Sequence, residues 1–539
     1  MIRLFIKESK TIVGAATIVG VLSFVSRIVG LVRDRILAGT FGAGDALDVY
    51  YAAFKVPDFL FSLIVVGALS ASFIPIFIKY NEGGISQKKA WQFTNNILHV
   101  LGFAMIITAL FIFIFANPLA SVIAPGFIAS KQASVALFMR VMIIAQVLLT
   151  ASMVFGSVLQ SLRRFFLYSL APIFYNIGII IGALVFVDWM GPIGLAWGVV
   201  FGAFLHLVVQ VVGARKLGYS YSFRFSLKDR DTKELLRLTG PRLLGIATSQ
   251  ILFLVLAVLA STLVVGSLTV FQFAYNIQFF AVGVIGVSYA IAVFPSLSRF
   301  AKDDDMQRFV STLSSTIRQM LYLLLPMSVL FLVMRAQIVR VVVGAGEFDW
   351  SATIATADTL AFFAITFIPQ ALVFVLARGY FALHDTITPL MAALVGALVG
   401  IISAFLFIEN FGVIGLGMAY SLASLVNALL LWIPLRQRLG TLDESRITQS
   451  LMKMLAATFV CAVIMQFLKP VVVSVLKLDT FVGVFLQGFI AGGIGIAAYI
   501  VVLHLLKSRE QVLFLSAIKR RLLKKAAPGE TLSTGAGQN

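Results

Sequence analysis

The chain has 539 residues, of which 60% are hydrophobic and only 12% are charged, with 42 lysines and arginines against 23 acids. Because a soluble domain carries about twice that charged fraction, the composition excludes a soluble enzyme, a disordered chain and a fibrous protein. In a soluble protein the net charge of +19 would suggest binding to nucleic acid. In a membrane protein, the distribution of the basic residues among the loops indicates which side of the membrane each loop faces. The single cysteine, Cys461, excludes a disulfide framework.

Apolar segments long enough to cross a bilayer, which takes about 20 residues, recur from one end of the chain to the other. They predict an all-α polytopic membrane protein with about fourteen transmembrane helices. In chain order the predicted helices cover 12–32, 46–78, 92–116, 135–160, 167–187, 193–213, 240–265, 268–297, 313–334, 354–382, 387–408, 412–435, 450–474 and 481–506.

The basic residues are distributed unevenly between the two sides of the predicted membrane. With the N-terminus in the cytoplasm, thirty lysines and arginines fall in the termini and in every second loop, and seven fall in the loops between. Since positively charged loops stay on the cytoplasmic side, both termini are predicted to be cytoplasmic. The seven on the outer side are Arg33, Arg35, Lys131, Arg335, Arg340, Lys469 and Lys477.

Sequence landmarks of the first half recur in the second half in the same order. The segment VLQSLRRFFLYSLAP at 158–172 resembles VLARGYFALHDTITP at 375–389, and Ile-Gly-Leu at 193–195 returns at 414–416. An offset of about 220 residues holds six predicted helices, so the copies share one orientation, as in transporters built from parallel repeats. The predicted parts are six-helix lobes at 1–213 and 240–437, a basic cytoplasmic connector at 214–239, an appended helix pair at 438–507 and a basic, then flexible, cytoplasmic tail at 508–539.

No catalytic constellation stands out in the sequence. The four histidines are scattered without a metal-binding spacing, and there is no phosphate-binding glycine loop. We therefore expect neither an enzyme nor a metal site nor a cofactor.

Charged residues concentrate instead in the first two predicted helices and the loop between them. They are Arg27, Arg33, Asp34, Asp48, Lys55 and Asp58. A charge at bilayer depth costs at least ~2.5–3.5 kcal/mol, so it usually faces a cavity or a partner. Arginine grips phosphate through its planar fork and lysine supplies a compact charge, which favours a binding site for an anionic group. An ion-pair network that joins the helices, Arg27 with Asp58 or Lys55 with Asp48, explains the same residues about as well.

Polar amides also occur inside the apolar spans. Gln272, Asn276 and Gln278 cluster in the eighth predicted helix, whereas Asn176 and Asn427 stand alone. Such lone amides are more often hydrogen bonds between helices than ligands of a substrate.

One stretch of the sequence resembles a known family. The run SRIVGLVRDRILAGTFGAGDALDVYYAAFKVPDFL at 26–60 is similar to the N-terminal signature of the MurJ (MviN) family of lipid II flippases. These belong to the multidrug/oligosaccharidyl-lipid/polysaccharide exporter superfamily. The segments at 156–176, 294–300 and 376–389 extend the resemblance over most of the chain.

The resemblance implies a transporter in the bacterial cytoplasmic membrane, which moves the undecaprenyl-diphosphate-linked peptidoglycan precursor to the outer leaflet by alternating access. In that family a cationic cavity between the lobes receives the headgroup, and the last two helices form a groove for the lipid tail. Membrane lipids and the cell-wall synthesis machinery are expected partners, and nucleic acid is not. Matched position by position, the implied substrate-binding residues are Arg27 and Arg33, with Ser26, Asp34 and Asp48 as companions; we add Lys55 and Asn276.

The sequence departs from the family pattern at several charged positions. Where well-studied members carry an arginine pair and an acid after the second-helix proline, this chain has Phe61, Ser62 and Val66. Where they carry an Asp-Arg pair in the eighth helix, it has Tyr275 and Asn276. A sodium site described for some members needs an acid in the seventh helix that this chain lacks. A flippase for another polyprenyl-linked glycan, or a drug or metabolite antiporter of the same superfamily, therefore remain alternatives.

Overall fold

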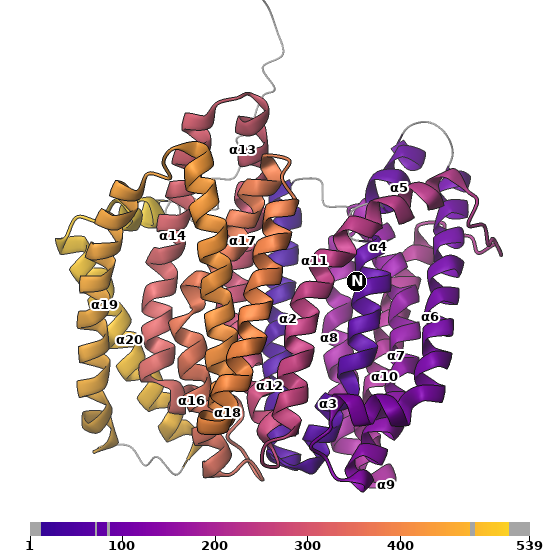
Figure 1. The fold of residues 1–539 in the computed structure, drawn as a ribbon, viewed down its shortest axis with the longest axis horizontal. Helices are drawn as coiled ribbons and strands as arrows, with labels where there is room; N and C mark the ends of the chain where they lie inside the picture. The colour runs from indigo at the N-terminus through magenta and orange to yellow at the C-terminus, as the bar shows by residue number, and fades with distance from the viewer. Residues whose placement is uncertain (1–11, 70–72, 83–86, 475–479, 517–539) are drawn as a thin grey trace, which may run out of the picture. The chain divides into compact units, whose positions relative to one another are not determined.

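The computed structural model describes residues 12–69, 73–82, 87–474 and 480–516, and these form helices joined by short connections (Figure 1). The described residues contain no strand, which confirms the predicted all-α class. The predicted basic ends of the chain fall partly in 1–11 and 517–539, outside the described residues.

The helices follow one another with few long connections. The first part of the chain forms α2 (Ile12–Phe41), α3 (Asp45–Phe61), the π-helical turn η1 (Ser62–Val66), α4 (Gly67–Leu69), α5 (Phe73–Glu82), α6 (Gln87–Ile123), α7 (Ala129–Ser161), α8 (Phe165–Ile181), η2 (Gly182–Phe186), α9 (Val187–Met190), η3 (Gly191–Ile193) and α10 (Gly194–Lys216). The second part forms α11 (Arg230–Ser261), α12 (Ser267–Val282), η4 (Gly283–Val287), α13 (Ser288–Lys302), α14 (Met306–Val333), α15 (Arg335–Val342), α16 (Trp350–Ile365), α17 (Phe367–Ala382), α18 (Ile387–Leu439), α19 (Glu444–Val473) and α20 (Phe481–Leu505).

Contacts between these helices divide the chain into two compact units. Unit 1 comprises Met1–Phe280, Arg335–Phe363 and Ile387–Asn427. Unit 2 comprises Ala281–Met334, Ala364–Thr386 and Ala428–Asn539. The predicted division into two six-helix lobes, a connector, a helix pair and a tail stays a prediction.

Many helices are long and apolar enough to cross a membrane. Among the described residues nine qualify, or up to ten if the bent pair α16 and α17 counts as one span, so the chain is a multi-pass membrane protein. Two of these runs have 52 and 53 residues. At 1.5 Å per residue each is more than twice as long as the ~30 Å core of a bilayer. The predicted count of fourteen spans stays a prediction.

Both long runs are interrupted at a glycine. Gly191 lies between α9 and α10 with φ of +69°, and Gly412 lies inside α18 with φ of +55°, a conformation that residues with a Cβ rarely adopt. Gly396, on one side of the second break, packs against Asn427 on the other side. Each run therefore folds back on itself, as the predicted pairs 167–187 with 193–213 and 387–408 with 412–435 require.

The first described helix is longer than the sequence predicted. The apolar pattern placed its end at residue 32 and Arg33 and Arg35 in an outer loop, but α2 continues to Phe41. The charges do not end the helix because both arginines have partners. Arg35 donates from Nη1 to the carbonyl of Val341 at 2.6 Å, near the carbonyl end of α15, and Arg33 is bonded as described below.

Close packing of small residues joins α8 to α10 in unit 1. Gly178 of α8 and Gly182 of η2 face Gly202 and Gly198 of α10, so that a Cβ on any of the four would collide with the opposite backbone. Pairs of glycines four residues apart let membrane helices approach closely. This contact fixes α8, which carries Asn176 of the site described next.

In unit 2, α19 and α20 pack against each other and both contact α14 (Figure 1). The hydroxyl of Tyr499 on α20 donates to the carbonyl of Tyr322 on α14 at 2.9 Å. The last two long helices are therefore attached to the body of unit 2 by buried polar contacts as well as by apolar ones.

Candidate functional site

Arg33 lies at the centre of the polar contacts of unit 1. Its Nε and Nη2 both donate to Oδ1 of Asp34, at 3.0 and 2.7 Å, and its Nη1 donates to Oδ1 of Asn176 at 2.9 Å. The Arg33 side chain is 21% exposed, whereas that of Asp34 is 4% exposed. A buried carboxylate needs such a partner, because an unpaired charge away from water costs several kcal/mol. The guanidinium therefore joins α2 to α8 and still reaches the surface.

The other oxygen of Asp34 continues the contacts into α12 and α3. Asp34 Oδ2 accepts from Asn276 Nδ2 at 3.0 Å, and Asn276 Oδ1 accepts from Gln272 Nε2 at 2.9 Å. Gln272 Oε1 in turn accepts from Lys55 Nζ at 2.9 Å. Gln272 and Asn276 can meet because residues four apart share one face of a helix. We call these residues the polar chain: Asn176, Arg33, Asp34, Asn276, Gln272 and Lys55.

Aromatic rings run between Arg27, which lies beside the polar chain, and Lys55, which belongs to it. The Arg27 guanidinium lies 5.6 Å from the centroid of the Phe279 ring, and Lys55 Nζ lies 4.4 Å from that of Phe253. Tyr275 stands between them, with its ring centroid 5.9 Å from Phe279 and 4.5 Å from Phe253. We call Phe279, Tyr275 and Phe253 the aromatic ladder. The face of an aromatic ring attracts a cation without neutralising its charge, so both side chains remain available to an anion.

Asp48 belongs to a separate cluster, in which it is itself buried. Its Oδ1 accepts from the backbone N–H and the hydroxyl of Thr269, and its Oδ2 accepts from the N–H of Gly266 and from Lys131 Nζ, all between 2.8 and 3.1 Å. The side chain of Asp48 is 2% exposed and that of Lys131 is 10% exposed. The carboxylate thus caps the first turn of α12, where backbone N–H groups lack partners.

The alternative of ion pairs between the first two predicted helices named the wrong partners. Asp58 accepts from Gln146 Nε2 at 2.6 Å, and Asp48 pairs with Lys131. Lys55 bonds Gln272, and Arg27 donates to the carbonyl of Phe279 at 3.4 Å, a long hydrogen bond. In the described part of the chain, the expected ion pairs are replaced by amide partners for Asp58 and Lys55, and Asp48 pairs with Lys131 instead of Lys55.

The structure brings most of the predicted substrate-binding residues together and separates one. Arg33, Asp34, Lys55 and Asn276 are members of the polar chain, and Arg27 adjoins it through the aromatic ladder. Ser26 is half-buried beside Arg27 in α2. Asp48 contacts none of these residues in the hydrogen bonds described above.

Sequence reasoning gave too little weight to two amides. Gln272 links Lys55 to Asn276, and Asn176 anchors Arg33 to α8. The signal was present, since an amide inside an apolar span must find a hydrogen-bond partner. Their partners, however, lie 217 and 143 positions away in the chain, which no local pattern reveals.

The positions that depart from the family pattern contribute neutral groups. Ser62 accepts from Gln250 at 3.4 Å, and Tyr275 belongs to the aromatic ladder and packs edge-on against Tyr420. In the residues that the structure describes, no group of three His, Cys, Asp or Glu side chains is placed to hold a metal ion.

Comparison with known proteins gives consistent matches. The model of the family described as "Lipid II flippase MurJ" matches residues 37–486. The probable lipid II flippase MurJ of Rhizobium tropici is 30% identical over 431 residues, which cover 78% of this chain and 80% of that protein. The probable lipid II flippase MurJ of Buchnera aphidicola subsp. Acyrthosiphon pisum (strain APS) is 27% identical over 496 residues, 91% of this chain and 96% of that protein.

Solved structures share the fold. A lipid II flippase MurJ in an inward-closed conformation aligns with a TM-score of 0.75 at 22% identity, covering 90% of this chain and 98% of that chain. An inward-facing multidrug resistance transporter of the MATE family, in the MOP superfamily, aligns with a TM-score of 0.66 at 14% identity, covering 78% and 96%. At these identities the likeness shows the architecture alone.

Proposed function

Because this chain belongs to the MurJ family of lipid II flippases, we propose that it moves undecaprenyl-diphosphate-linked peptidoglycan precursor from the cytoplasmic to the outer leaflet by alternating access. It acts as a transporter and not as a catalyst of a chemical reaction. The proposal rests on the family match over 37–486 and on the kinds of side chain that the polar chain brings together.

The charges of the polar chain are the observation that supports this group of residues as the binding site for the diphosphate. Within it Asp34 neutralises one charge of Arg33 and Lys55, so one positive charge is left over, and Arg27 adds a second beside the aromatic ladder. A diphosphate diester carries a negative charge on each of its phosphates. With the carboxylate of Asp58 one helical turn after Lys55 also counted, the site keeps an excess positive charge that attracts that group, and the Arg33 fork and the Lys55 ammonium supply its hydrogen-bond donors.

The amides explain how such a site can both bind and release its substrate. Asn176 and Gln272 accept from the two cations with amide oxygens, which are neutral and therefore bind a cation less strongly than a charged carboxylate or phosphate does. A phosphate can replace an amide oxygen at Lys55 or Arg33 without breaking a charge pair. A substrate drives alternating access only through its different affinity for the two states, so partners that exchange readily suit this mechanism.

The membrane potential can contribute to the return of the empty carrier. Moving one elementary charge across the membrane is worth ~2.3 kcal/mol per 100 mV. An empty site with an excess positive charge is drawn toward a negative cytoplasm, whereas the diphosphate cancels that charge during the outward step. This proposal places the chain in the bacterial cytoplasmic membrane with both termini in the cytoplasm, as the distribution of basic loops favours. The predicted pair α19 and α20 would then receive the lipid tail.

One observation favours a second candidate, a flippase for another polyprenyl-linked glycan. At Ser62 and Tyr275 the site offers a hydroxyl and an aromatic face instead of family charges. The diphosphate is common to all such carriers, whereas the headgroup beyond it differs. A neutral, aromatic surface beside the cations would suit a headgroup with fewer charges.

Complementation tests the proposal and separates the two candidates. The chain would be expressed in a strain depleted of its own lipid II flippase, with accessibility of lipid II in the outer leaflet as the readout. Growth with restored outer-leaflet lipid II supports the lipid II assignment. Failure at a normal membrane level, repeated with the cognate cell-wall proteins co-expressed, would contradict it and favour the second glycan.

A further inference from the structure

The last long helix of unit 2, α20, ends in a sharp turn at 503–509, which we call the corner. The N–H of Ser508 donates to the carbonyl of Leu503 at 3.0 Å, the wide hydrogen bond of a Schellman motif. Lys507, between them, has φ of +50°, where glycine is the usual residue. The chain then turns into a second helical stretch at 509–516. Because α20 has 25 residues and rises about 37 Å, this corner lies at the surface of the bilayer that α20 crosses.

A buried ion pair holds the corner in place. Glu510 is 3% exposed and accepts from Arg318 of α14 at 2.6 Å, from Ser450 of α19 at 2.8 Å and from Ser508 at 3.0 Å. Burial alone would raise the pKa of this carboxyl, but the hydrogen bonds from backbone, hydroxyl groups and guanidinium together lower it below its usual value. Glu510 is therefore charged and already neutralised by Arg318, so it cannot neutralise the basic side chains around it.

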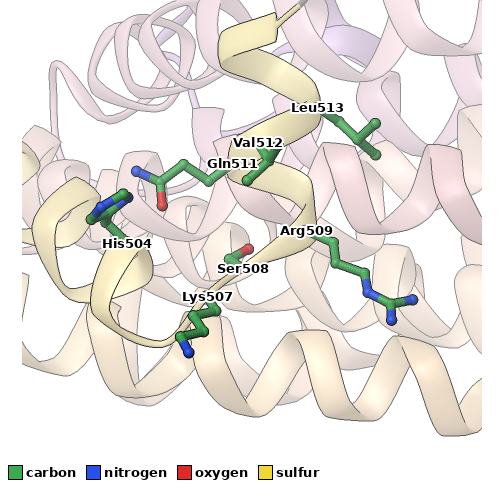
Figure 2. Close-up of a pocket in the computed structure, with 7 residues that line it drawn as sticks. All are labelled: His504, Lys507, Ser508, Arg509, Gln511, Val512 and Leu513. Atoms are coloured by element: carbon green, nitrogen blue, oxygen red, sulfur yellow. The ribbon is translucent and has the colours of Figure 1, made fainter.

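Those basic side chains line a pocket of about 430 Å³ at the corner (Figure 2). His504, Lys507 and Arg509 are exposed, and Val512 and Leu513 form an apolar part of the lining. Figure 2 shows these side chains spread around the turn at Ser508. Apolar groups nearby are open as well, with Leu505 72% and Val512 64% exposed. Cations beside open apolar groups at the bilayer surface match the two parts of a phospholipid, its phosphate and the start of its acyl chains.

We propose that this corner is a binding site for a resident anionic phospholipid, whose phosphate lies among His504, Lys507 and Arg509 and whose acyl chains lie along Leu505 and Val512. Five further basic residues follow at 519–525 in the sequence, which adds to the attraction of a negatively charged leaflet. The lipid would fasten α20 to one depth in the membrane. The proposal does not depend on the transport function.

The test counts lipids that stay bound to the purified full chain. Native mass spectrometry would compare retention of phosphatidylglycerol and of phosphatidylcholine by the wild-type chain, by K507Q/R509Q and by R299Q/K302Q. The second variant is the matched control, because it removes two exposed cations at the end of α13, away from the pocket. Lys507 and Arg509 supply most of the positive charge of the pocket lining, and Glu510 does not neutralise them. We therefore expect K507Q/R509Q to lose at least about tenfold in apparent phosphatidylglycerol affinity, and the control to stay within about twofold.

Three results would overturn the proposal. Equal retention of the two lipids by the wild-type chain would show that the net negative charge of the lipid is not recognised. Equal losses in K507Q/R509Q and in R299Q/K302Q would show general attraction of a basic protein and no site. Displacement of phosphatidylglycerol by millimolar inorganic phosphate would show a site for free phosphate and not for a lipid. A melting temperature of K507Q/R509Q equal to wild type in lipid-free detergent confirms that the variant is folded.

Discussion

Two charged regions of unit 1 come from the same stretch of sequence and differ in how their charges are satisfied. Asp48 is 1% exposed and its two oxygens accept four hydrogen bonds, three of them from the start of α12. In the polar chain, Arg33 and Lys55 remain partly exposed, and each has an amide oxygen among its partners: Asn176 for Arg33, beside Asp34, and Gln272 for Lys55. A charge whose every bonding position is used serves the fold, whereas a charge with neutral, replaceable partners can serve a ligand. The contrast separates residues that the sequence motif grouped together.

Removing Asp48 should have the largest effect on stability. Asp48→Ala leaves the first turn of α12 without its cap and Lys131 with only the exposed Asp45 as an acid, and we expect it to cost about 3 kcal/mol, the lower end of the range for breaking a buried pair. Thermal unfolding in detergent measures this. Asp45→Ala is the matched control, because Asp45 contacts the same lysine at 2.6 Å but its side chain is 67% exposed, and exposed pairs are worth less than about 1 kcal/mol. Equal losses of stability in the two variants would contradict the special role of Asp48 in the fold.

Arg33 should be required for transport beyond its role in the fold. Arg33→Ala leaves Asp34 buried without its cation and should lose both stability and transport. Arg33→Lys keeps the charge beside Asp34 but not the fork that also reaches Asn176. We expect the lysine variant to fold normally and to lose about tenfold in flipping rate, measured in proteoliposomes. A lysine variant with full activity would show that charge alone suffices.

Lys55 tests the opposite end of the polar chain and should matter less. Lys55→Met removes the ammonium while its apolar stem still packs near Phe253, so stability should change by less than about 1 kcal/mol. Flipping should slow by roughly tenfold through loss of one charge-assisted hydrogen bond to the substrate. Lys55→Arg is the control and should keep most of the rate. Unchanged flipping by Lys55→Met would remove Lys55 from the site.

The smallest expected effect is a change in the pH dependence of stability at Glu510, a buried and fully bonded carboxylate outside the membrane spans. Its pKa in the folded chain is below the usual value of 4.5, because its hydrogen bonds to Ser450, Ser508 and Arg318 and from the backbone outweigh its burial. A lowered folded pKa stabilises the fold above the usual value, and this contribution is lost as the pH falls below about 4.5 through the folded value. Melting temperature should therefore decline with acid in the wild-type chain and decline less steeply in Glu510→Gln. Parallel pH profiles would contradict this role.

The sequence predicted the architecture better than the contacts of the site. Apolar length was enough to predict a helical multi-pass membrane protein, and the breaks at Gly191 and Gly412 fall between helices that the sequence predicted as separate. The apolar pattern ended one helix too early, since it placed Arg33 and Arg35 in a loop after residue 32, whereas α2 continues to Phe41. Local patterns cannot show that an arginine has partners elsewhere in the chain, and those partners make it compatible with a helix.

For the site, the sequence identified the residue types and not their grouping. It named Arg33, Asp34, Lys55 and Asn276, which the structure brings into one chain of hydrogen bonds. It placed Asp48 with them because the motif is contiguous. Only the fold shows that the turn after Phe41 carries Asp48 to the start of α12 instead.

The most direct test of the central claim is whether the polar chain recognises the diphosphate itself. Binding of undecaprenyl diphosphate and of undecaprenol, which lacks the phosphates, would be compared for the purified wild-type chain, Arg33→Lys and Asp45→Ala. Our account predicts a preference for the diphosphate that shrinks about tenfold in Arg33→Lys, stays intact in Asp45→Ala and leaves undecaprenol binding unchanged. A preference that is the same in all three proteins would contradict it.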